Sequence, residues 1–121
     1  MDIVISNAAG KPIYEQIASQ VKLQVMKGTL RPGEQLPSIR SLANDLGVSV
    51  ITTKRAYSDL EDQGFIQTVQ GKGSFVASGN EEFLQEERLK RIEDHLAKAV
   101  DEAQLAGISP DQLHEMLDAL L

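Results

Sequence analysis

The run GVSVITTKR, at positions 47–55, gathers side chains of three chemical kinds within about two helical turns. It supplies hydroxyl, apolar and cationic groups, which come from Ser49, Val50, Ile51, Thr52, Lys54 and Arg55. A hydroxyl group can bond to a phosphate, and a lysine or arginine can reach a phosphate or the edge of a guanine. An aliphatic side chain can contact the methyl group of thymine. If these residues are exposed together, they can contact DNA.

Two short helices are predicted to hold this run at a turn. Ser38 and Ser49 can each cap a helix, and Gly47 can end the first of the two, which leaves a turn of about three residues between them. We expect the second helix to continue to about Gln63. In a helix-turn-helix, the second helix enters the major groove by its N-terminal residues.

The core side of the second helix follows from its apolar spacing, and we expect it to be formed by Val48, Ala56, Tyr57 and Leu60. The residues at the start of the helix then project outward. The alternative is that Val50 and Ile51 pack against a neighbouring helix, and the spacing alone leaves both interpretations open.

The segments on either side predict a helix before this pair and a β-hairpin after it. An apolar stripe runs through a first helix over about 12–27, and consists of Tyr14, Ile17, Val21 and Val25. Residues 29–37 contain two prolines, so we expect a connector that reverses the chain. Two β-rich runs, 65–69 and 74–78, flank a glycine-rich tip.

The composition changes after Gly79. Residues 1–79 carry eight Lys and Arg against seven Asp and Glu, whereas residues 80–121 carry four against eleven. Two amphipathic helices are predicted there, the second one starting with a serine cap and a proline at its first position. Their apolar stripes comprise Leu89, Ile92, Leu96, Val100, Leu113, Leu117 and Leu120. Two helices of this length cannot bury these residues between themselves, so we expect a second copy of the chain to cover them. The alternative is that the two helices pack against the N-terminal domain of the same chain.

Length and composition limit the remaining possibilities. The chain has 121 residues and no cysteine, which suits one domain, or one domain with an appendage, and excludes disulfides and cysteine-ligated zinc. The net charge of -6 argues at first against nucleic acid, but the acidic tail accounts for it and would be repelled from DNA. No segment has the pattern of a signal peptide or a membrane span, so a cytoplasmic protein is expected.

Four spaced motifs carry a family resemblance. They are G-x-L-x-P-G-x-x-L-P-S-x-R at 28–40, the L-G-V-S turn, A-Y-x-x-L-E-x-x-G and G-x-G-x-F-V. Over residues 12–77 the chain resembles the winged helix-turn-helix domain of GntR-family bacterial transcription regulators. The acidic tail resembles that of the YtrA subfamily, which is a small dimerisation element. The resemblance implies a mainly α fold with a small β wing, a DNA-binding domain at 1–78 and a C-terminal two-helix dimerisation element at 79–121.

The resemblance also implies positions that contact DNA. The matching positions are an arginine in the first motif, polar and basic residues at the start of the recognition helix, and the wing: Arg40, Ser49, Thr52, Lys54, Gln70 and Gly71. Val50, Ile51, Arg55 and Lys72 complete our candidate set. Many family members have Arg or another polar residue directly after the turn serine, whereas this chain has Val50 and then Ile51. We therefore predict more apolar base readout at these positions, with thymine as the candidate base.

Other motifs favour simpler explanations. The segment GKGS at 71–74 lacks the spacing of a nucleotide-binding loop, and we expect solvated helix faces to explain His95 and His114. No nucleophile and base share a motif, so we expect neither an enzyme nor a cofactor. The runner-up is a protein-interaction module, which the cations at 40, 54, 55 and 72 disfavour.

The expected function is regulation of transcription. A two-fold dimer would double the base contacts and read a pseudo-palindromic operator in double-stranded DNA. The resemblance implies repression of nearby operons, often ones that encode ABC transporters. Two short helices leave little room for an effector pocket unless it lies between domains or subunits, so any small-molecule effector is unidentified.

Overall fold

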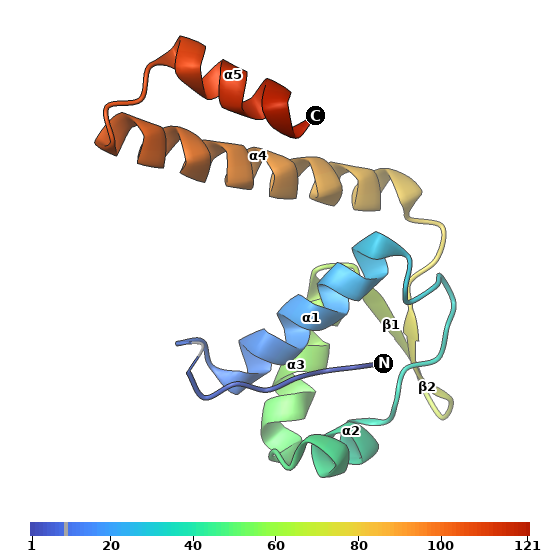
Figure 1. The fold of residues 1–121 in the computed structure, drawn as a ribbon. Helices are drawn as coiled ribbons and strands as arrows, with labels where there is room; N and C mark the ends of the chain where they lie inside the picture. The colour runs from blue at the N-terminus through green and yellow to red at the C-terminus, as the bar shows by residue number, and fades with distance from the viewer. Residues whose placement is uncertain (9) are drawn as a thin grey trace. The chain divides into compact units, whose positions relative to one another are not determined.

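A computed structural model describes every residue of the chain except Ala9. The described residues form five helices and a two-stranded sheet in the order α1, α2, α3, β1, β2, α4 and α5 (Figure 1). The chain divides into two compact units, Met1–Glu81 and Glu82–Leu121. The expected fold class, mainly helical with a small β wing, is confirmed.

Three helices make the core of the first unit: α1 (Ile13–Lys27), α2 (Ile39–Leu46) and α3 (Val50–Asp62). Helix α3 packs against both of the others. The predicted stripe of α1 is buried at Ile17, Val21 and Val25, whereas Tyr14 is only partly buried. Ala56, Tyr57 and Leu60 of α3 are buried as predicted, while Val48 is half-buried. The aliphatic core therefore fixes the direction of α3 within this unit.

The hairpin follows α3 directly. Strands β1 (Ile66–Val69) and β2 (Gly73–Val76) pair antiparallel. The predicted run 65–69 contains β1 and begins one residue before it, whereas the predicted run 74–78 begins one residue after the start of β2 and extends two residues past its end. Phe65 and Ala77, which flank the ladder, are buried and are joined by the hydrogen bond from the Ala77 amide to the Phe65 carbonyl.

The connector between α1 and α2 does more than reverse the chain. The Leu36 amide donates to the Ser74 carbonyl at 2.8 Å, and the Val76 amide donates to the Glu34 carbonyl at 2.8 Å. Gln35 forms an antiparallel bridge with Phe75. Residues 33–36 thus lie along the outer edge of β2, a role that the two flanking prolines hid from the sequence pattern.

Three glutamines on one face of α1 hold the N-terminal segment. Gln20 bonds to both the amide and the carbonyl of Val4, at 2.9 and 2.7 Å, and Gln24 donates to the Asp2 carbonyl at 2.7 Å. Gln16 bonds in the same way to the amide and carbonyl of Ser6. Four helical residues rise about 6 Å and two extended residues about 6.7 Å, so the spacings nearly match. Residues 2–6 therefore run antiparallel to α1 (Figure 1).

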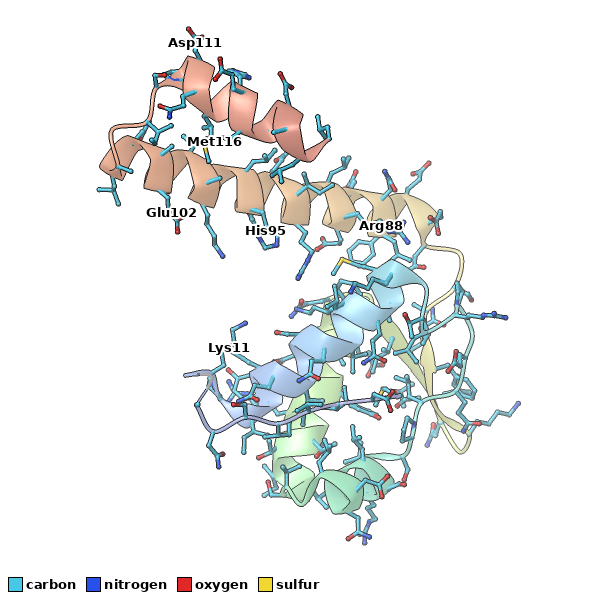
Figure 2. The ribbon with its side chains drawn as sticks, viewed as in Figure 1. Lys11, Arg88, His95, Glu102, Asp111 and Met116 are labelled. Carbon is cyan, nitrogen blue, oxygen red and sulfur yellow. The ribbon has the colours of Figure 1, made fainter. Side chains whose placement is uncertain are left out.

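The second unit is built from α4 (Glu81–Leu105), which begins at the boundary, and α5 (Pro110–Leu120). The Ser109 side chain accepts a hydrogen bond from the Gln112 amide at 3.2 Å, which confirms the predicted cap. Helix α5 runs back along α4, with Met116 between the two helices and with His95 and Glu102 on the opposite face of α4 (Figure 2). The apolar stripe of α4 nevertheless stays 41 to 55% exposed at Leu89, Ile92, Leu96 and Val100.

No described helix is long and apolar enough to cross a membrane.

Candidate nucleic-acid interface

The turn between α2 and α3 is built by caps that the sequence predicted. The Ser38 hydroxyl accepts a hydrogen bond from the Ser41 amide at 3.1 Å, and Gly47 ends α2 with a φ of 66°. The Ser49 hydroxyl accepts from the Thr52 amide at 3.0 Å and so caps α3. A capped helix start has its first amides directed outward and carries partial positive charge, both of which favour contact with a phosphate.

The hydroxyl groups of this turn also bond to each other. Ser49 Oγ donates to Thr52 Oγ1 at 2.8 Å, and the buried Thr53 hydroxyl donates to the Ser49 carbonyl at 3.1 Å. Ser49 therefore uses both its donor and its acceptor capacity to shape the helix start. The Thr52 hydroxyl, which has accepted one bond, keeps its own hydrogen for another acceptor such as a phosphate oxygen.

The two apolar residues at the start of α3 are exposed, but unequally. Ile51 is 82% exposed and Val50 is 46% exposed. Val50 lines a shallow hollow of about 390 Å³ together with Arg40, Ala43, Asn44, Gly47 and Val48. The alternative that both residues pack against a neighbouring helix is therefore wrong for Ile51, and the hollow places Val50 beside Arg40 of α2.

Arg55 has a partner that the sequence reasoning missed. Its guanidinium carbon lies 3.7 Å from the centre of the Tyr14 ring, and Nη2 donates to the Tyr14 hydroxyl at 3.1 Å. A stacked and hydrogen-bonded arginine has fewer conformations to lose when it meets a phosphate. The apolar stripe of α1 suggested that Tyr14 belongs to the core, whereas the structure gives it the role of holding Arg55.

The wing carries the remaining predicted residues at its tip. Gln70, Gly71 and Lys72 join β1 to β2 and are all exposed. The Lys72 amide donates to the Val69 carbonyl at 2.9 Å, and the Lys72 carbonyl accepts from Gln35 Nε2 at 3.0 Å. Gly71 has a φ of 78°, in the left-handed region that favours glycine. Gln35, which sequence reasoning did not single out, therefore braces the tip from the connector.

The predicted residues thus group at two places on the first unit. The first place is the start of α3, where Ser49, Val50, Ile51, Thr52, Lys54 and Arg55 follow one another and a hollow joins Val50 to Arg40 of α2; the second is the wing tip, with Gln70, Gly71 and Lys72. The second half of α3 is acidic, with Asp59, Glu61 and Asp62. Only the N-terminal half of the helix therefore has charge that suits a polyanion.

No group of three or more His, Asp or Glu side chains that could hold a metal ion occurs among the described residues. His95 lies on an exposed face of α4, opposite the side that faces α5 (Figure 2).

Comparison with known proteins identifies the class. Residues 13–76, which comprise α1, α2, α3 and the β1–β2 hairpin, match the model of the bacterial regulatory proteins of the gntR family. The chain belongs to the GntR family. It is a transcription regulator of the DNA-binding winged-helix class rather than an enzyme, as the motifs predicted.

Individual GntR-family relatives extend the match beyond the winged domain. The chain is 35% identical to the HTH-type transcriptional repressor YtrA of Bacillus subtilis over 115 residues, which are 95% of this chain and 88% of that relative. The structure of YtrA from Sulfolobus acidocaldarius is 41% identical, with a TM-score of 0.60 over 74% of this chain and 96% of that one. The predicted resemblance to YtrA-type members is confirmed.

A third comparison concerns a complex with DNA. The DNA-binding domain of AraR in complex with operator ORX1 is 29% identical, with a TM-score of 0.56 over 64% of this chain and 96% of that one. That neighbour, which shares the winged fold of the first unit, is thus seen bound to an operator.

Proposed function

We propose that this protein is a repressor that binds a pseudo-palindromic operator in double-stranded DNA as a homodimer. The observation that carries the proposal is the start of α3, where a capped helix end presents exposed apolar and cationic side chains beside Arg40. An exposed helix start of this kind has the size and charge to enter a major groove. The YtrA relative from Bacillus subtilis, which is a repressor, supports the regulatory direction.

Each group of residues has a part in this proposal. The α2–α3 turn, with Arg40, Ile51 and Lys54, contacts base edges and phosphates in the major groove. The wing tip at 70–72 follows the adjacent minor groove. Arg55, held by Tyr14, contacts a phosphate beside the turn. In this proposal, the first unit binds DNA and the second unit forms the dimer.

The homodimer is supported by the exposed apolar surface of the second unit. Four residues of α4 are 41 to 55% exposed, α5 adds Met116, Leu117 and Leu120 to the exposed apolar residues, and Leu121 follows directly after it. Leu113, which was also predicted to line the interface, is half-buried. Contiguous apolar surface of this kind marks an interaction site, and a two-fold copy of the same hairpin offers a self-complementary cover. Two subunits then place two winged domains on two half-sites.

The resemblance to the YtrA subfamily also supports a class of target genes. We propose that the protein represses an operon that encodes a transporter. The hollow beside Val50 and a second one of about 460 Å³ beside β1, to which Glu61, Thr68 and Asn80 contribute, are both open to solvent. An effector site is usually enclosed, so neither hollow is proposed as one.

Enrichment of bound duplexes from a randomised DNA pool, at two salt concentrations, tests the proposal. We expect a two-fold symmetric motif, bound at roughly 10⁻⁸ M or tighter at physiological salt and more weakly at higher salt. Arg40→Ala should weaken binding at least about tenfold. Lys98→Ala, which removes the same charge from the acidic tail, serves as the control and should leave affinity unchanged. Binding that stays in the nonspecific range for every duplex would overturn the proposal and favour the protein-interaction module.

A further inference from the structure

Ile51 occupies a special place on α3. The buried side of this helix is formed by Thr53, Ala56, Tyr57 and Leu60. At about 100° per residue, the nine positions between Ile51 and Leu60 turn the helix through about 180° beyond two full turns. Ile51 therefore points directly away from the core, and its 82% exposure agrees with this. Neither packing within the first unit nor helix propensity accounts for a β-branched apolar residue here.

The surroundings of Ile51 distinguish it from an ordinary exposed aliphatic residue. Lys54 and Arg55 follow it by one helical turn, and both are exposed. Arg55 is fixed beside it by the stacking contact with Tyr14 at 3.7 Å. An apolar side chain flanked by cations at a capped helix start suits a partner that is anionic at its edges and apolar at its centre. The major groove of DNA has this arrangement, because phosphates border a floor of base edges.

The chemistry of the groove then selects the base. An isoleucine side chain has no hydrogen-bond donor or acceptor, so it cannot distinguish bases by their polar edges. Among the four bases, thymine alone presents an apolar group in the major groove, its C5-methyl. We propose that Ile51 contacts the C5-methyl group of one thymine in each half-site, and that this contact makes the protein specific for a T·A pair at that position of the operator. This proposal rests on the operator binding proposed above.

Val50 does not share this role. Val50 lines the hollow with Arg40 and Asn44 and is only 46% exposed, so it lies partly against the α2 side of the turn, whereas Ile51 is 82% exposed. The two adjacent aliphatic residues thus have separate functions: Val50 supports the turn beside Arg40, and Ile51 reads the base. This difference provides a matched control on the same helical turn.

Replacement of thymine by uracil tests the proposal, because it removes the methyl group and keeps the base pair and the O4 acceptor. The probe is the symmetric duplex enriched from the random pool, with deoxyuridine placed at one thymine position of both half-sites at a time. We expect a loss of about fourfold per half-site, or about 15-fold for the two, at one position only. The affinities of wild type, Ile51→Ala and Val50→Ala for each duplex are measured by fluorescence anisotropy, and circular dichroism checks that both variants are folded.

The variants decide the assignment. Ile51→Ala should bind the thymine duplex about as weakly as the wild type binds the uracil duplex, and should show no further loss with uracil. Val50→Ala should keep the uracil effect. If the wild type binds all uracil duplexes as tightly as the thymine duplex, methyl readout is overturned while operator binding stands. If the uracil effect persists in Ile51→Ala, another residue reads the methyl group and the assignment is overturned. Failure to enrich any duplex would instead overturn the proposed function.

Discussion

Replacement of Gln16 provides a strict test of how the N-terminal segment is held. The Gln16 side chain is only 7% exposed and makes three hydrogen bonds of 2.9 Å. Its Oε1 accepts from the Ser6 amide, and its Nε2 donates to the carbonyls of Ser6 and Lys11. Gln16→Leu keeps a similar volume but leaves one backbone donor and two backbone acceptors without a partner. Each lost hydrogen bond costs about 1 kcal/mol, so the sum is about 3 kcal/mol.

Two effects reduce this sum. The leucine gains some apolar burial, and the freed backbone groups can reach water if residues 2–6 move away from α1. We therefore expect Gln16→Leu to lower the free energy of unfolding by about 2 kcal/mol. Urea unfolding measures it, at one protein concentration for all variants, because the stability of the proposed dimer would depend on concentration. Hydrogen exchange of the Ser6 amide should become faster in the same variant.

Gln24→Leu is the matched control. Gln24 lies two turns further along the same face of α1 and makes a single exposed bond, to the Asp2 carbonyl. Its replacement should change the free energy of unfolding by less than about 0.5 kcal/mol. If Gln16→Leu unfolds within that same margin of the wild type and its Ser6 amide stays protected, the proposed role of the glutamine face is refuted.

Three further predictions follow from the other elements. Leu96→Glu should raise the dimer dissociation constant more than about tenfold in sedimentation equilibrium, because it places like charges in the interface, whereas Leu105→Glu at the exposed end of α4 should not. Lys72→Gln should reduce the slope of log K against log salt by about 2 for a dimer, one phosphate contact per subunit, and an unchanged slope would remove the wing from the interface. Burial raises the pKa of Tyr57 to about 12, so the folded state favours the neutral phenol. The contribution of this group to the free energy of unfolding is therefore complete below about pH 10. It is lost, by up to about 2 to 3 kcal/mol, as the pH rises to 12. Tyr57→Phe should lack this alkaline loss but be about 1 kcal/mol less stable at neutral pH, because the hydroxyl donates to the Pro37 carbonyl at 2.7 Å; equal pH profiles in urea unfolding would contradict the assignment.

Local signals in the sequence were sufficient for the helices and their caps. Ser38, Ser49 and Ser109 all accept the hydrogen bonds that their positions predict. The reason is that a cap depends on residues three positions apart, so its geometry is contained in a few letters. The hairpin was predictable for the same reason, since its turn glycines lie between two short β-rich runs.

Contacts between distant segments were beyond sequence patterns. The apolar spacing of α1 placed Tyr14 in the core, but its partner Arg55 lies 41 residues later in the chain. The bond from Gln35 to the Lys72 carbonyl spans 37 residues, and no periodicity marks it. The glutamines of α1 did leave a signal, because positions 16, 20 and 24 are four residues apart and share one face. Their partner is an extended segment without side-chain periodicity, so the pairing required the structure.

At the start of α3, the residues that stabilise the fold differ from the residue that we propose reads the operator. Ser49 and Thr52 bond to each other and to the helix, and Thr53 anchors the same turn in the core, whereas Ile51 contributes nothing to this framework. Under the base readout proposed above, a substitution at position 51 alters target choice without a cost in stability, because surface changes of this kind usually stay within about 0.5 kcal/mol. In evolutionary terms, a duplicated gene could acquire a new operator through this codon alone. For protein engineering, position 51 is accordingly the first site to randomise.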